Sequence, residues 1–147
     1  MPKIMKDMNI ISRCQLSYRS EMTSNELLGC HHPFVLAICR KPGMTQDEIS
    51  RELCLNKSTV ARALIQLEEK GYVKRESKPD DKRSVIVFPT DKMTQILPTV
   101  KKIADNFNEM ISCDISESEL EIFVSVLEKM SKKARKITQK TEGVVEK

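Results

Sequence analysis

The stretch that most constrains this fold is residues 45–70, TQDEISRELCLNKSTVARALIQLEEK, which holds two helix-start signals close together. Thr45 and Glu48 form a capping-box pattern, in which the threonine oxygen accepts the backbone N–H of residue 48 at the start of a helix. Asn56 is a favourable N-cap for a second helix. That second helix has an inward apolar stripe at positions i, i+4 and i+7, formed by Val60, Leu64 and Leu67. Two short amphipathic helices joined by a tight turn are therefore predicted.

A basic hairpin is predicted directly after this helix pair. Gly71 ends the second helix, and two β-prone segments, 72–77 and 84–88, are separated by KPDDKR, in which Pro79-Asp80-Asp81 has turn chemistry. Lysine and arginine residues flank the turn. Many small proteins use two capped helices followed by a basic hairpin to present a helix to DNA, so DNA binding is the working hypothesis.

Further helices are predicted on both sides of this central region. Apolar residues recur at helical spacing over 4–28, in the segment after Thr90, and after a second capping box at 116–119. Gly29 is predicted to end the first of these helices. The apolar run 34–39 fits both a strand and a buried helix. We favour the helix, because a proline lies at its start and basic residues and a Pro-Gly pair follow it. Pro98 predicts a kink or a boundary in the segment after Thr90.

Composition favours a small helical protein. The 147 residues include 4% aromatic residues and no Trp, which favours packed aliphatic helices over a β-sandwich. Lys and Arg number 25 against 21 Asp and Glu, a mild excess that permits nucleic acid as a partner. Five cysteines without CxxC spacing fit reduced thiols, and neither a signal peptide nor a membrane-spanning stretch is recognisable. We therefore expect a cytoplasmic protein.

The order of these predicted elements resembles that of the MarR family of winged helix-turn-helix regulators. The phrases KSTVARALIQLEEKGYVKR and PDDKR carry the resemblance, and the second contains the family's Asp-x-Arg pattern as Asp81-Lys82-Arg83. The resemblance implies a mostly α fold with six helices plus a β-hairpin wing. It implies an N-terminal dimerisation helix over 1–32, a winged helix-turn-helix DNA-binding domain over 33–90, and C-terminal dimerisation helices with a charged tail over 91–147.

The resemblance also implies a function. A member of this family is expected to be a homodimer that binds a pseudo-palindromic double-stranded operator and regulates transcription. Repression relieved by a small apolar or phenolic effector is the expected mode of regulation. A two-fold dimer would place its two recognition helices about one DNA turn, ~34 Å, apart.

The predicted DNA-binding residues lie on the second helix and on the hairpin. With the apolar stripe facing inward, the outward helix residues are Lys57, Ser58, Thr59, Ala61, Arg62 and Gln66. Arg62 offers paired donors to guanine O6 and N7, whereas hydroxyls and backbone N–H groups near the helix start suit phosphates. Phosphate contacts on the hairpin are predicted for Lys74, Arg75, Lys78 and Lys82. Arg83 is predicted to enter the minor groove, and Asp81 to orient it through an ion pair.

Two alternative functions remain open at the level of sequence. A winged-helix module could bind an acidic protein surface in place of DNA. Alternatively, by the resemblance, Cys14 lies at about the place where peroxide-sensing members keep a reactive thiol, so Cys14 is a candidate for redox sensing. No nucleophile phrase, Walker loop or HExxH motif is recognisable, and no enzyme activity is expected.

Cys30-His31-His32 and Cys39 have side chains that can bind a metal, but the chain has only these two histidines. A helix start at His32-Pro33 is the better account, and neither a metal nor another cofactor is predicted. Cys54, between two leucines, is expected in the core.

Overall fold

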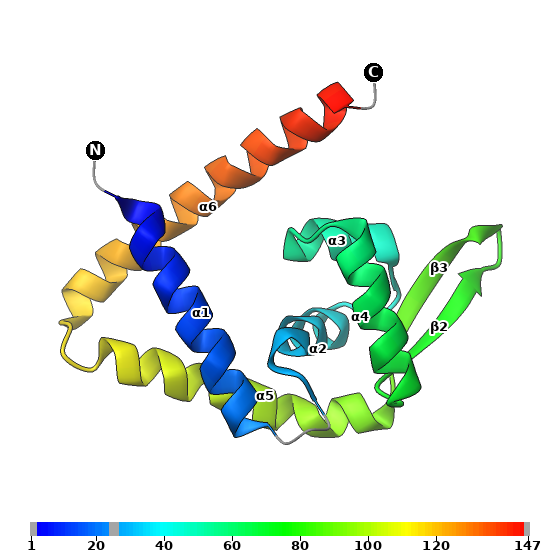
Figure 1. Cartoon of the computed structure of the whole chain (residues 1–147), viewed down its shortest axis with the longest axis horizontal. Coiled ribbons are helices and arrows are strands. Elements are labelled where there is room, and N and C mark those ends of the chain that lie inside the picture. The colour runs from blue at the N-terminus through cyan, green and yellow to red at the C-terminus, as the bar shows by residue number, and fades with distance from the viewer. Residues whose placement is uncertain (1–2, 24–26, 146–147) are drawn as a thin grey trace. The chain divides into compact units, whose positions relative to one another are not determined.

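The structure is a computed structural model that describes residues 3–23 and 27–145. The chain divides into two compact units, Met1–Phe107 and Asn108–Lys147. The described elements are α1 (Ile4–Met22), the 3-10 turn η1 (Gly29–His31), α2 (His32–Arg40), β1 (Met44–Thr45), α3 (Gln46–Leu53), α4 (Lys57–Glu69), β2 (Val73–Lys78), β3 (Asp81–Pro89), α5 (Asp91–Ser112) and α6 (Glu117–Val145) (Figure 1). The predicted class, mostly α with six helices and a β-hairpin wing, is confirmed.

The first helix is shorter than predicted. α1 ends at Met22, and Thr23 has an extended backbone with φ −102° and ψ 131°, while residues 24–26 of the predicted helix lie outside the described residues. Gly29 does not end this helix, because it belongs to η1 and lies against α1. A Cβ atom at Gly29 would lie 2.5 Å from the Ser20 Oγ atom and 3.0 Å from two backbone atoms of α1, Leu16 O and Ser20 N, so the close approach of the two segments favours glycine here.

Both predicted caps of the helix-turn-helix are present. Thr45 Oγ1 accepts the backbone N–H of Glu48 at 3.1 Å, and Asn56 Oδ1 accepts that of Thr59 at 2.8 Å. These bonds satisfy helix-end donors that have no partner within the helix, and so define where α3 and α4 begin.

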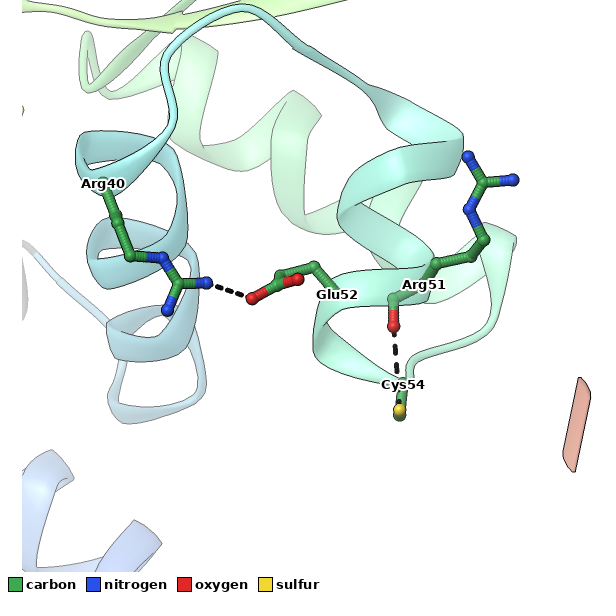
Figure 2. A network of polar contacts seen from close by, with 4 residues as sticks. All are labelled: Arg40, Arg51, Glu52 and Cys54. Atoms are coloured by element: carbon green, nitrogen blue, oxygen red, sulfur yellow. Dashed lines mark hydrogen bonds and ion pairs between the residues drawn. The ribbon is translucent and has the colours of Figure 1, made fainter. Parts of the chain in front are cut away.

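The prediction for Cys54 is wrong. This residue ends α3 in the left-handed region with φ 52°, and its side chain is exposed. Its Sγ atom faces the Arg51 carbonyl oxygen at 3.7 Å, at the rim of the turn (Figure 2). The left-handed cap reverses the chain direction after Leu53, so residue 54 does not continue the inward face of the helix.

The core of the first unit lies under α3 and α4. Ile49, Val60, Leu64 and Leu67 are each 0% exposed, and they belong to one cluster with Phe34, Val35 and Ile38 of α2. The run 34–39 is therefore a buried helix, as predicted, with a proline in its first turn.

The sheet contains one strand that was not predicted. The strand order is β1-β3-β2, and the two-residue strand β1 pairs Met44 with Val87 and Thr45 with Ile86. β2 and β3 form the predicted antiparallel hairpin, called the wing below, with Val73 opposite Pro89 and Arg75 opposite Val87. The base of the wing is thus joined through β1 to the start of the helix-turn-helix.

α5 begins where predicted and continues through Pro98, so this proline marks no boundary. Thr90 precedes α5, and its hydroxyl lies 2.6 Å from the Gly71 carbonyl oxygen and 3.0 Å from that of Tyr72. The capping box of α6 is also confirmed, because Ser116 and Glu119 exchange backbone N–H bonds with each other's side chains at 3.2 and 3.3 Å. Within the described ranges, no helix is both long enough and apolar enough to span a bilayer.

Candidate nucleic-acid interface

α4 presents a polar surface on the side opposite its buried stripe. Lys57, Ser58, Arg62 and Gln66 are exposed, and Thr59 and Ala61 are half-buried. At the start of the helix, Asn56 Oδ1 also accepts the Ser58 hydroxyl at 2.9 Å, and Lys57 Nζ lies 3.9 Å from Asp47 Oδ1 of α3. The helix N-terminus and the cationic side chains together favour an anionic partner.

The tip of the wing holds Asp81, Lys82 and Arg83, all of which are exposed. Asp81 Oδ1 accepts the backbone N–H of Arg83 at 2.9 Å, and Oδ2 accepts the Ser84 hydroxyl at 3.2 Å. An ion pair between the Asp81 and Arg83 side chains was predicted; the contact that the structure shows is an Asx turn to the Arg83 backbone. Asp81 therefore shapes the loop from which the Arg83 guanidinium projects. Lys78 lies opposite Asp81 across the irregular end of the hairpin.

Two predicted phosphate-binding residues of β2 are already paired with carboxylates. Lys74 Nζ lies 3.2 Å from Glu76 Oε1 on an exposed face of the strand. Arg75 points to the other face, where its Nε and Nη2 atoms donate to the two carboxylate oxygens of Glu68 on α4 at 3.1 and 2.9 Å. These bonds lower the pKa of the Glu68 carboxyl and raise the pKa of Arg75. Neither carboxylate partner was predicted from the sequence. Glu76 could have been found from its i, i+2 spacing along a strand, whereas Glu68 lies across a turn.

The link between α4, β2 and α5 is tight. Gly71 has φ 81°, a left-handed conformation suited to the helix end, and Tyr72 N donates to the Leu67 carbonyl at 2.8 Å. Lys92 Nζ of α5 donates to the Lys70 carbonyl at 2.8 Å and lies 4.5 Å from the centroid of the Tyr72 ring. The turn from α4 into the wing is therefore fixed by contacts with both α4 and α5.

A groove of about 500 Å³ lies between α2, α3 and α5 in the first unit. Its walls include Leu36, Leu53 and Leu97, and Lys101 lies on its polar side. Arg40 and Glu52 also line the groove, and they form an ion pair with each other (Figure 2). Such a lining, mainly apolar with a few charged groups, suits a small organic molecule.

The two histidines are buried at the junction of η1 and α2, with 2% of His31 and 1% of His32 exposed. His32 Nε2 lies 3.2 Å from the Thr23 hydroxyl, and His31 Nδ1 has no hydrogen-bond partner among the described atoms. Among the residues that the structure describes, no group of three or more His, Cys, Asp or Glu side chains is placed to hold a metal ion. Cys14, the candidate redox thiol, is exposed on α1.

We expect these histidines to make stability depend on pH. Burial, followed by the charges of Arg19 and His31, lowers the pKa of His32 from 6.5 to about 4, and burial also lowers the pKa of His31. Below pH 6.5 the unfolded chain therefore binds protons that the folded chain does not, and stability falls as the pH falls. For His32 alone, the expected loss between pH 7 and pH 5 is about 2 kcal/mol. Urea unfolding at both pH values measures it.

The matched variant for this measurement is His32→Gln, which keeps a neutral polar side chain but cannot gain the proton. Its free energy of unfolding should change less between pH 7 and pH 5 than that of the unmodified chain. Equal changes in the two proteins would contradict the assignment to His32.

A capped helix pair, a short strand joined to a hairpin, and an exposed polar face on the second helix define a winged helix-turn-helix protein. The sequence model of the MarR family matches residues 34–85. The transcriptional regulator HosA of Escherichia coli O111:H- is 34% identical over 94 residues, which are 64% of this chain and 70% of HosA.

Two solved structures extend the likeness over nearly the whole chain. A MarR transcriptional regulator from Methanosarcina mazei Go1 has a TM-score of 0.86 and 29% identity, covering 91% of this chain and 97% of that one. A MarR family regulator from Listeria monocytogenes, solved in complex with a 26mer DNA, has a TM-score of 0.86 and 23% identity over 92% and 91% of the two chains. This chain belongs to the MarR family. It is a DNA-binding transcriptional regulator and not an enzyme.

Proposed function

We propose that this protein is a cytoplasmic homodimer that binds a pseudo-palindromic operator and represses transcription until a small effector releases it. In this proposal α4 is the recognition helix. Arg62 and Gln66 read base edges, Lys57, Ser58 and Thr59 meet phosphates near the helix start, and Ala61 offers an apolar contact. Lys82 and Arg83 at the wing tip bind the adjacent backbone and minor groove, and Lys74 adds a phosphate contact.

The observation that supports this most directly is the division of α4 into two faces. Its buried face is anchored by side chains that are 0% exposed, and its other face carries the exposed Arg62 and Lys57. A helix whose buried face packs against the core can enter the major groove without a conformational change.

Dimerisation through the segments 1–32 and 91–147 is supported by unpartnered apolar surface. α1 has no buried residue, and six of its large apolar side chains are at least 43% exposed: Ile4, Met5, Ile10, Ile11, Leu16 and Met22. In the second unit, Ile122, Phe123 and Val124 of α6 are 50–66% exposed. A second copy of the chain would cover such surface, which monomeric soluble proteins rarely expose.

Relief by an effector is supported by the groove between α2, α3 and α5, whose mainly apolar walls suit a small phenolic or otherwise apolar molecule. To release DNA, the ligand must bind more tightly to the conformation that does not fit the operator.

Binding of duplexes selected from a random pool, measured over a salt series by fluorescence anisotropy, tests the function. We expect tight binding at low salt that weakens steeply as salt rises, because each neutralised phosphate releases counterions. Selected sequences should contain inverted repeats, and sedimentation at micromolar concentration should give a dimeric mass. A monomeric mass, or no duplex binding at low salt, would contradict the proposal and favour the protein-binding alternative.

Redox sensing through Cys14 would require that Cys14→Ser abolish a peroxide response.

A further inference from the structure

We propose that Arg75 is a positioning residue which, through Glu68 of α4, sets the direction of the wing relative to the recognition helix, and that Arg75 does not itself bind DNA. This inference rests on the proposed mode of DNA binding. The Glu68–Arg75 pair would orient the wing relative to α4 so that both can contact the same duplex.

The pair has the geometry of a fixed link. The two donated bonds, 3.1 and 2.9 Å long, join both carboxylate oxygens of Glu68 to the guanidinium plane of Arg75. Paired bonds of this kind fix orientation as well as distance, which a single lysine contact does not. The Arg75 side chain is 27% exposed and the Glu68 side chain 40% exposed, so Arg75 is the more enclosed of the two.

The position of Arg75 along the strand makes this link effective. On β2, Val73 is buried and Arg75 half-buried, whereas every residue from Glu76 to Lys78 is exposed. The pairing of β2 with β3 also becomes irregular between Ser77 and Lys78. Arg75 is therefore the outermost residue by which β2 is held to the body of the domain.

A small change at this point is enlarged at the tip. Arg83 lies about level with Ser77 and Lys78, two or three residues beyond Arg75, or ~8 Å at ~3.3 Å per residue. A change of ~15° in strand direction would move it by ~2 Å, which is enough to break a hydrogen bond to DNA.

The competing interpretation is that Arg75 binds a phosphate directly. Its Nε and Nη2 donors are already used by Glu68, and a phosphate that took them would leave the carboxylate unpaired next to the DNA backbone. As a neutral pair, Glu68 and Arg75 would add little to the salt dependence of binding.

Glu68→Ala and Glu69→Ala form a matched test, because both remove one negative charge from the end of α4 and Glu69 is exposed. Phosphate binding by Arg75 predicts that Glu68→Ala tightens duplex binding, since it frees the arginine. Positioning predicts that Glu68→Ala weakens binding ~10-fold while Glu69→Ala leaves it unchanged or tighter. Anisotropy with the selected duplex measures both.

A double-mutant cycle with the wing tip gives a readout that general loss of stability would not. We expect Arg83→Ala to weaken binding ~10-fold in the unmodified protein but less than ~2-fold in the Glu68→Ala background. We also expect Arg75→Ala to resemble Glu68→Ala both in Kd and in the slope of log Kd against log salt, because both variants release the same wing. The proposal is overturned if Glu68→Ala binds as well as Glu69→Ala, or if Arg75→Ala lowers the slope by ~0.9 more than Glu68→Ala does, the value for one further lost phosphate contact.

If circular dichroism shows that the single variants do not fold, the proposal is tested with the double variant E68R/R75E, in which the two charged residues are exchanged. A folded exchanged protein in which Arg83→Ala again weakens binding ~10-fold supports the proposal, and one in which Arg83→Ala has no effect overturns it. Failure of the proposed function is a different result, because the unmodified protein would then bind no duplex at all.

Discussion

Arg62→Ala should weaken binding to the selected duplex by about 1–3 kcal/mol, which is roughly 5- to 150-fold. Arg62 is exposed in the second turn of α4, and the buried stripe on the opposite face packs the helix against the core. If its guanidinium reads guanine, the loss should be largest for the selected sequence and small for an unrelated duplex. Anisotropy titrations with the two duplexes measure the difference.

Lys41→Ala is the control for charge, because it also removes one exposed cationic side chain, at the end of α2 and outside α4, the wing and the proposed dimerisation segments. It should bind both duplexes nearly as the unmodified protein does. Equal losses for Arg62→Ala on both duplexes would show that Arg62 contacts phosphates and does not select sequence.

Leu64→Ala should lower the free energy of unfolding by about 2–5 kcal/mol. Leu64 is 0% exposed in the cluster that joins α4 to α2 and α3, so its truncation removes apolar contacts and leaves a cavity behind the recognition helix. Urea unfolding followed by circular dichroism measures the change.

Ile65→Ala is the matched control, because Ile65 is the next residue on the same helix and is 44% exposed. Its effect should be within about 0.5 kcal/mol, as is usual for surface positions. Similar losses in the two variants would mean that Ile65 is covered in solution and that α4 has a second packed face.

Locally determined features were predicted well from the sequence. The caps at Thr45, Asn56 and Ser116 were all predicted and are all present. Each joins a side chain to a backbone group three residues away, and such contacts depend on little beyond the local chain. Pro98 was predicted to mark either a kink or a boundary, and it is not a boundary, because the tertiary context of a long helix can outweigh the missing N–H of one proline.

Features that depend on distant segments were predicted poorly. The two-residue strand β1 has no pattern of its own and exists because Val87 lies opposite Met44. Gly29 was predicted as a helix stop because glycine is common at helix ends, but it is favoured here because α1 approaches it closely. The exposure of Cys54 was also missed, although its cause is local, because a left-handed turn at this residue reverses the direction of the chain.

The same division applies to the DNA-binding surface. The sequence by itself determined which residues of α4 face outward, because the period of its apolar stripe assigns each position to a face. Only the tertiary structure decided which hairpin cations are engaged within the protein. Glu68 and Arg75 meet because the chain turns at Gly71 and brings the end of α4 beside β2, and no helical or strand period spans such a turn.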